Sequence, residues 1–166
     1  LKKIKSVNGR LELVKVLSNG TKVFIDYAHT PDALKTALTS LKHHYNEDVT
    51  LVFGCGGERD KQKRIPMARI ANKYAKKIYV TDDNPRNENP KKIRRLLIKN
   101  IEKEKVIEIG DRAKAIRSAL KESKIANTVL IAGKGHETLQ DYGNKKINIS
   151  DKVIINKLRL KKIKFS

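Results

Sequence analysis

At 166 residues the chain is long enough for one domain with a hydrophobic core, and no apolar run approaches the roughly 20 residues of a membrane helix. Its formal charge of +20 favours anionic partners, but the lysines are scattered in pairs and aromatic residues make up only 5%, which argues for a solvated surface and against nucleic acid as a partner. The single cysteine, Cys55, excludes an internal disulfide and fits a reducing cytoplasm.

The first elements are predicted from turn and cap signals. Two short apolar runs, 11–16 and 23–27, flank an Asn19-Gly20 pair, which is typical of a hairpin. Thr30 followed by Pro31 predicts the cap and first position of a helix, and Leu residues at helical spacing continue it. A strand over 50–53 then opens into a glycine-rich loop.

The remaining elements alternate between helix and strand, without a linker or an internal repeat. The expected order is a helix through Met67 and Tyr74, a strand ending at Asp82, a helix through Ile93 and Leu97, a strand over 106–109, a helix that Asp111 caps, a strand over 128–132, a short strand over 147–149, and a helix beginning at Ser150 or Asp151. This alternation predicts an α/β, Rossmann-like fold: a mostly parallel sheet with helices on both faces and an N-terminal hairpin.

The stretch from Tyr79 to Pro90, YVTDDNPRNENP, ends a β-branched run abruptly in turn-forming residues. Asp and Asn favour turns, and Pro85 disfavours a helical conformation at Asn84, so the chain leaves the strand here. In an open parallel sheet, loops at the carboxyl ends of the strands form the ligand crevice. A carboxylate, an amide and a guanidinium on one such loop suit a small ligand with both ammonium and carboxylate groups.

Four strand-end loops carry unusual residues: DYAHTP, GCGGERD, TDDNPR and AGKGHE. Arg59 and Arg86 can grip carboxylates through paired hydrogen bonds, and Asp83 and Glu137 can receive ammonium groups. Arg59 also occupies the place of the third glycine in the dinucleotide fingerprint, and the sequence holds no Walker A pattern. The chain therefore lacks a phosphate-binding loop of either kind.

The histidines of these loops are not assigned to a metal. His29 and His136 lack a second ligand at metal-site spacing, and an isolated loop histidine is usually solvated or hydrogen bonded. Cys55 has no base partner in the sequence and is interpreted as structural. We assign no catalytic residue and no metal ligand to this chain.

Six motifs follow one another along nearly the whole chain: NGRLE at 8–12, DYAHTPDAL at 26–34, VFGCGGERD at 52–60, DDNPR at 82–86, the Asp111-Arg112 turn and AGKGHE at 132–137. In this order they resemble the C-terminal domain of the Mur ligases, and within that family the members that add the third residue of the peptidoglycan stem peptide. Two positions depart from the family's pattern. Asn8 stands where proline is common, and Gln62 stands where glycine is common.

The resemblance implies an ATP-dependent ligase that forms ADP. The family phosphorylates the D-glutamyl carboxylate of UDP-MurNAc-L-Ala-D-Glu, and the amine of the incoming amino acid then attacks the acyl phosphate. The P-loop and most Mg²⁺ ligands belong to a central domain of the same enzyme. We therefore expect residues 1–166 to be a single C-terminal domain of a longer cytoplasmic protein, as a chain that begins at Leu1 and has Met67 as its only methionine also suggests.

The resemblance also implies roles for single residues. Arg10 is expected to reach the ATP phosphates and Asp26 to hold the ribose. The amino-acid site is expected to comprise Arg59, Asp83, Asn84, Pro85, Arg86, Gly133 and Glu137. In the family, DNPR accompanies meso-diaminopimelate, and members that add lysine lack this arginine. A guanidinium suits the additional carboxylate of diaminopimelate and repels the distal ammonium of lysine.

Three other interpretations stay open at this point. The chain is a basic nucleic-acid-binding domain, a Mur-type ligase for lysine, or an oxidoreductase domain that binds a nucleotide. The missing dinucleotide fingerprint argues against the last of these.

Overall fold

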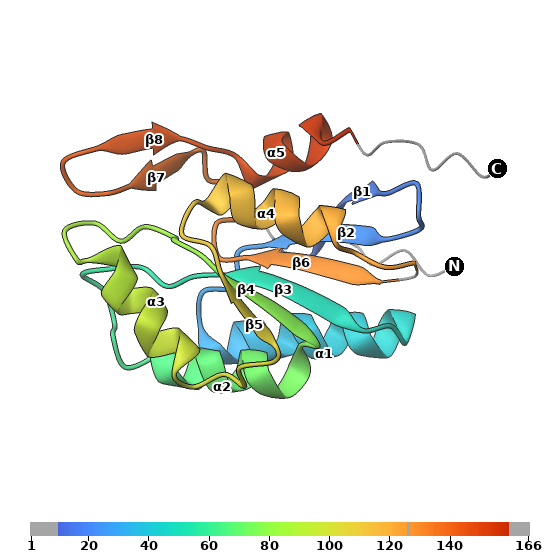
Figure 1. Cartoon of the computed structure of the whole chain (residues 1–166), viewed down its shortest axis with the longest axis horizontal. Coiled ribbons are helices and arrows are strands. Elements are labelled where there is room, and N and C mark those ends of the chain that lie inside the picture. The colour runs from blue at the N-terminus through green and yellow to red at the C-terminus, as the bar shows by residue number, and fades with distance from the viewer. Residues whose placement is uncertain (1–9, 126, 160–166) are drawn as a thin grey trace.

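The computed structural model describes residues 10–125 and 127–159 (Figure 1). Asn8, one of the two positions that depart from the family pattern, lies outside the described residues. The elements in chain order are β1 (Glu12–Val16), β2 (Lys22–Asp26), α1 (Pro31–Tyr45), β3 (Val49–Phe53), α2 (Arg64–Tyr74), β4 (Lys77–Val80), α3 (Pro90–Ile98), β5 (Val106–Glu108), α4 (Arg112–Lys121), β6 (Thr128–Ala132), β7 (Leu139–Asp141), β8 (Lys146–Asn148) and α5 (Asp151–Lys157).

Six strands form one sheet in the order β1-β2-β6-β3-β4-β5. Only β1 runs antiparallel to its neighbour, and β2, β6, β3, β4 and β5 are parallel. The central strands β3 and β6 are buried along their whole length, as their unbroken apolar sequences lead one to expect. The mostly parallel sheet with an N-terminal hairpin is thus confirmed.

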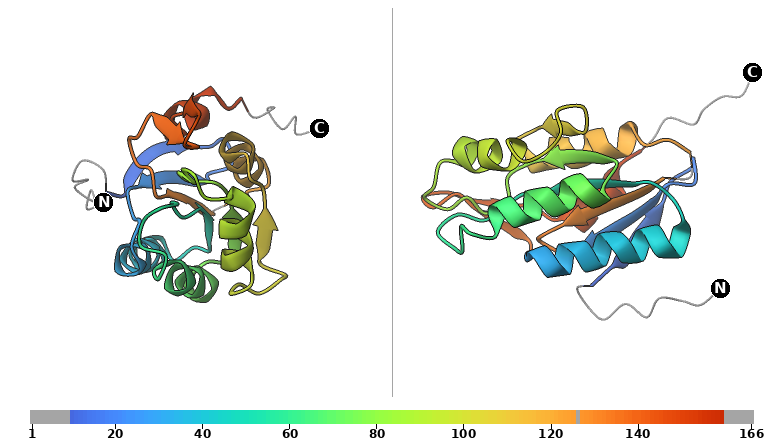
Figure 2. Two further views of the ribbon diagram at one scale, coloured as in Figure 1. Left: turned by 90° about the vertical axis from the view of Figure 1, so that its left-hand side faces the viewer. Right: turned by 90° about the horizontal axis from the view of Figure 1, so that it is seen from below.

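Helices cover both faces of this sheet (Figure 1). On one face α1, α2 and α3 bury Leu38, Met67 and Leu97 against the strands, and α1 and α2 run side by side (Figure 2). On the other face α4 and α5 bury Ile116 and Ile155. Two hydrophobic layers therefore enclose the sheet, as in doubly wound α/β folds. No helix among the described residues is long and apolar enough to cross a membrane.

Side-chain caps fix where several helices begin. Thr30 Oγ1 accepts from the Ala33 amide at 3.2 Å, with Pro31 at the first position of α1. Asp111 caps α4 and Ser150 caps α5 in the same way, so these predicted starts are confirmed. Helix α2 differs, because Lys63 provides no side-chain cap. The caps leave the loops after β2 and β5 short and well defined.

A second sheet, formed by β7 and β8 alone, contacts the loop that follows β4. The predicted strand over 147–149 corresponds to β8, whereas β7 was not predicted. The Gln140 amide donates to the carbonyls of Asp82 and Asp83 at 3.1 and 2.8 Å. The Tyr142 hydroxyl donates to Asp82 Oδ2 at 2.7 Å. The hairpin therefore holds the loop after β4 from its outer side.

Candidate ligand-binding site

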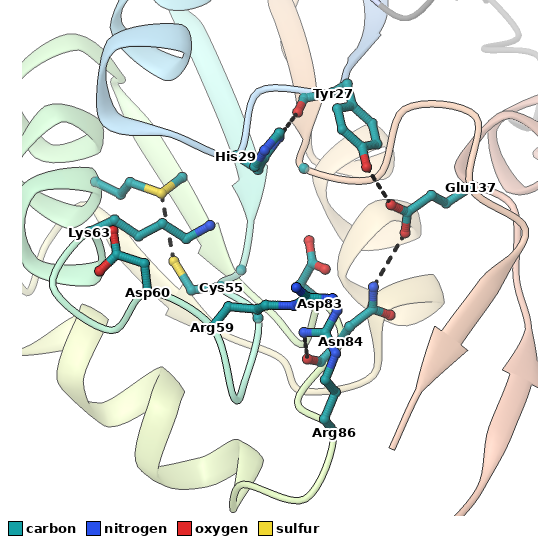
Figure 3. A pocket seen from close by; sticks show the side chains of 14 residues that line it. Tyr27, His29, Cys55, Arg59, Asp60, Lys63, Asp83, Asn84, Arg86 and Glu137 are labelled. Atoms are coloured by element: carbon teal, nitrogen blue, oxygen red, sulfur yellow. Dashed lines mark hydrogen bonds between the residues drawn. The ribbon is translucent and has the colours of Figure 1, made fainter. Parts of the chain in front are cut away.

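A cavity of about 380 Å³ lies where β2, β3, β4 and β6 reach their carboxyl ends (Figure 3). This is the edge at which parallel sheets bind ligands. Six residues that the sequence assigned to the amino-acid site line this cavity: Arg59, Asp83, Asn84, Arg86, Gly133 and Glu137. Pro85 does not line it and is buried behind the loop. The structure therefore brings together residues that are up to 78 positions apart in the chain.

The carboxylate of Asp83 points into the open centre of the cavity (Figure 3). Its close neighbour is Gly133, where a Cβ would stand 2.6 Å from Asp83 Oδ2. Gly133 has a φ of +113°, a conformation that side chains rarely adopt. Burial raises the pKa of the Asp83 carboxyl, against the attraction of Arg112 and Lys134. A ligand ammonium at this position would therefore stabilise the ionised carboxylate.

Glu137 is the second carboxylate in the cavity. Its Oε1 accepts from the Tyr27 hydroxyl at 3.0 Å, and its Oε2 accepts from Asn84 Nδ2 at 3.3 Å and Lys134 Nζ at 2.9 Å. Burial would raise the pKa of Glu137, but the hydrogen bond and charge of Lys134 lower it overall. Glu137 therefore offers an ionised carboxylate to a ligand.

Two arginines supply positive charge to the same cavity. Arg59 is exposed at its rim. Arg86 Nη1 donates to the carbonyls of Gly57 at 2.8 Å and Asn84 at 3.4 Å, which fixes its guanidinium. Within residues 10–125 and 127–159, no carboxylate lies within 4.0 Å of the Arg86 nitrogen atoms. Arg86 thus keeps a net positive charge that a ligand carboxylate can neutralise.

Glu88 clamps the glycine-rich loop to the loop that carries Arg86. It accepts from Arg64 Nη1 and Nη2, both at 3.0 Å, and from the Glu58 amide at 2.7 Å. These contacts, led by Arg64, lower the pKa of Glu88 to about 2. Sequence reasoning missed this clamp, although an acidic residue two positions after Arg86 was an available signal.

Arg112 ties the ends of two strands to α5. It is fully buried, and its guanidinium donates to Asp151 Oδ1 and Oδ2 at 2.8 and 2.7 Å. It also donates to the carbonyls of Ala132, at the end of β6, and Asp82, after β4. The Asp111-Arg112 motif therefore supports the site from behind.

A neighbouring cavity of about 520 Å³ is lined by the two residues that the sequence assigned to the nucleotide, Arg10 and Asp26. Asp26 accepts from the amides of Leu11 and Ala28, each at 2.6 Å. Burial raises the pKa of Asp26, against these two hydrogen bonds and the charge of Arg10. Tyr27 and His29 line both cavities, so the two spaces adjoin. Sequence reasoning did not single out Tyr27, which directly follows Asp26.

The described residues contain no group of three or more His, Cys, Asp or Glu side chains that could hold a metal ion. His29 Nδ1 lies 2.8 Å from the Tyr27 carbonyl, and His136 Nε2 lies 2.7 Å from Glu12 Oε2. Cys55 is buried against Met67, and burial raises the pKa of its thiol to about 12. A neutral, enclosed thiol agrees with a structural role for Cys55.

Residues 9–135 match the family described as Mur ligase, glutamate ligase domain. The chain belongs to this family. Among the curated relatives of this Mur ligase domain, the UDP-N-acetylmuramoyl-L-alanyl-D-glutamate–2,6-diaminopimelate ligase of Rickettsia montanensis is 46% identical over 159 residues. The enzyme of the same name from Buchnera aphidicola subsp. Acyrthosiphon pisum is 48% identical over 162 residues. The matches cover 95% and 97% of this chain and 32% of each relative, so the chain spans about a third of their length.

Solved structures show the same relationship. A structure of UDP-N-acetylmuramoyl-L-alanyl-D-glutamate–2,6-diaminopimelate ligase shares 35% identity and a TM-score of 0.82, over 93% of this chain and 32% of that one. The Mycobacterium tuberculosis folylpolyglutamate synthase has 19% identity and a TM-score of 0.63, over 77% of this chain and 30% of the synthase. At that identity the synthase shares only the fold of the Mur ligase domain.

Proposed function

We propose that this Mur ligase domain binds the amino-acid substrate of an ATP-dependent ligase that adds meso-diaminopimelate to UDP-MurNAc-L-Ala-D-Glu. The observation that carries the proposal is the pairing of charges in the first cavity. Asp83 and Glu137 supply two anions, and Arg59 and Arg86 supply two cations. The names of the relatives with 46% and 48% identity support the same substrate.

Diaminopimelate carries two ammonium and two carboxylate groups, which is the same balance of charges as the cavity offers. Arg86 is fixed by backbone carbonyls and remains without a carboxylate partner among the described residues. It suits the carboxylate that distinguishes diaminopimelate from lysine, because a guanidinium binds a carboxylate through two parallel hydrogen bonds. Asp83 and Glu137 suit the ammonium groups. Lysine would leave Arg86 unpaired in a partly desolvated cavity.

ATP is proposed to bind in the neighbouring cavity, with the ribose at Asp26 and the phosphates toward Arg10. Both oxygens of Asp26 already accept one amide each, which orients the carboxylate and leaves lone pairs for a ribose hydroxyl. The sequence has no phosphate-binding loop, so we propose that a central domain of the same protein holds most of the ATP phosphates and Mg²⁺. Mg²⁺ would neutralise the charge that develops on the transferred phosphoryl group.

The proposed reaction has two steps. The γ-phosphoryl group of ATP passes to the D-glutamyl carboxylate, which forms an acyl phosphate and ADP. The amine of diaminopimelate then attacks the acyl carbon, forms the amide and releases phosphate. In both steps this domain contributes the position of the amine, since Asp83, Glu137 and Arg86 surround the amino acid and hold it against the adjoining nucleotide cavity.

The proposal is tested with the purified full-length protein that contains this chain. We expect ADP release that requires ATP, Mg²⁺, UDP-MurNAc-L-Ala-D-Glu and meso-diaminopimelate together. The 166-residue chain alone, given the same four components, should release no ADP, because it lacks a phosphate-binding loop. A full-length protein that forms no amide with diaminopimelate, or ADP release by the isolated chain, would contradict the proposal.

A further inference from the structure

Lys134 lies in the AGKGHE loop and is fully buried. Its ammonium donates to three acceptors: Leu139 O at 2.7 Å, Glu137 Oε2 at 2.9 Å and Asn84 Oδ1 at 3.0 Å. An ammonium has three N–H donors and no acceptor, so this set uses all of them. Because Lys134 is enclosed and saturated, it has no donor left for a ligand in the cavity.

The contact with Lys134 determines which way the Asn84 amide faces. Asn84 Oδ1 lies 3.0 Å from Lys134 Nζ and 2.9 Å from the Asp141 amide, and both of these groups only donate. The oxygen of Asn84 must therefore face them. Its NH₂ group must then face Glu137 and the cavity, which Asn84 lines. Lys134 thus turns the donor side of Asn84 toward any bound carboxylate.

The same ammonium fixes the second carboxylate of the cavity. Glu137 Oε2 is held by Lys134, while Oε1 is held by the Tyr27 hydroxyl. Burial would raise the pKa of Glu137, and Lys134 supplies the largest opposing contribution. Without this cation, Glu137 would take up a proton at a higher pH than it does beside Lys134.

We propose that Lys134 is a positioning residue for the amino-acid substrate, which aims the Asn84 amide and the Glu137 carboxylate into the cavity without touching the substrate. The inference rests on the proposed function and deepens it. Lys134 also holds the Leu139 carbonyl at the start of β7, so the hairpin and the cavity wall meet at one ammonium. A purely structural lysine would have no reason to select, as two of its three acceptors, side chains that line the cavity.

The test compares Lys134→Met with wild type in the full-length protein, measuring kcat and KM separately for meso-diaminopimelate and ATP. We expect the KM for diaminopimelate to rise roughly ten- to a hundredfold, the size of one lost charge-assisted contact. The KM for ATP should change by less than about threefold, because Arg10 and Asp26 lie outside this network. Lys145→Met, at an exposed lysine of the same hairpin, is the matched control and should leave both constants unchanged.

Two further readouts separate positioning from simple structural support. The acidic limb of the kcat/KM profile for diaminopimelate should move to higher pH in Lys134→Met, because Glu137 loses its cation. Lys134→Arg, which keeps the charge, should recover part of the affinity for diaminopimelate. If Lys134→Met does not fold, the same constants are measured on Lys134→Gln, which keeps two donors and loses the charge.

The outcomes distinguish this inference from the proposed function. A wild-type protein that does not use diaminopimelate refutes the proposed function itself. A wild-type protein that uses it, together with an unchanged KM for diaminopimelate and an unmoved acidic limb in the Lys134 variant that folds, refutes the role of Lys134 alone. A fall in kcat with neither KM changed is the result of lost folded protein, and it would also overturn the inference.

Discussion

Gly57 is where the glycine-rich loop meets the loop that carries Arg86, and Gly57→Ala is the sharpest perturbation that the structure offers. The Gly57 amide donates to Asn84 O at 2.8 Å, and the Gly57 carbonyl accepts from Arg86 Nη1 at 2.8 Å. A Cβ at Gly57 would stand 1.9 Å from Pro85 O and 2.7 Å from Pro85 C. Both are backbone atoms, so no change of rotamer relieves the clash.

The magnitude follows from these distances. Ordinary contact begins near 3.4 Å, so the two loops must part by about 1.5 Å to admit the methyl group. That movement breaks both hydrogen bonds, at about 1 kcal/mol each, and adds about 1–3 kcal/mol of overpacking. We expect Gly57→Ala to lower the free energy of unfolding by about 3–5 kcal/mol, which is roughly 6–20 °C in Tm for a chain of this length.

Thermal unfolding of the 166-residue chain by circular dichroism measures the stability change, and the KM for meso-diaminopimelate in the full-length protein measures the effect on the site. We expect this KM to rise, because the Arg86 guanidinium loses the carbonyl that holds it. Gly20→Ala is the matched control: Gly20 has a φ of +82°, and a Cβ there meets nothing within 4 Å. It should cost about 1–2 kcal/mol of backbone strain and leave the KM unchanged. Equal stability of Gly57→Ala and wild type, with equal KM, would refute this reasoning.

Two further predictions concern the nucleotide cavity and the clamp between the loops. Arg10→Ala and Asp26→Ala should each reduce kcat/KM for ATP roughly ten- to a hundredfold in the full-length protein, by loss of one charge-assisted contact; steady-state kinetics that leave both the KM for ATP and kcat unchanged would remove these residues from the site. The pKa of Glu88 is lowered from 4.5 to about 2, so the stability that its ion pair with Arg64 contributes is fully present above about pH 4.5 and is lost as the pH falls toward 2. Glu88→Gln should remove this part of the pH dependence of Tm, and identical Tm profiles for variant and wild type below pH 4.5 would contradict the assignment.

Much of the fold follows from local signals in the sequence. Thr30 with Pro31, and Asp111 after Gly110, state where two helices begin, because caps and proline act through nearest neighbours. The apolar runs of β3 and β6 predict central strands for a similar reason. Strand β7 escaped prediction because its three residues, Leu139 to Asp141, show no clear alternation. Its strand conformation comes from pairing with β8 and from contacts with the loop after β4.

The site divides along the same line. Loop membership predicts that Arg59, Asp83, Arg86 and Glu137 lie at one edge of the sheet, since the carboxyl ends of parallel strands meet there. Sequence cannot predict which charged groups face the cavity and which are enclosed. Lys134, two residues after a buried strand, is fully covered, whereas Arg59 remains at the rim. Burial of this kind depends on where the β7–β8 hairpin lies, which is a tertiary contact.

The most direct test of the proposed substrate is competition between meso-diaminopimelate and L-lysine in the full-length protein, for wild type and for Arg86→Ala. Arg117→Ala, at an exposed arginine of α4 outside the first cavity, is the control. We predict that wild type and the control strongly prefer diaminopimelate, and that Arg86→Ala reduces this preference roughly ten- to a hundredfold. Equal use of lysine by the wild type, or an undiminished preference in Arg86→Ala, would contradict a site in which Arg86 selects the amino acid.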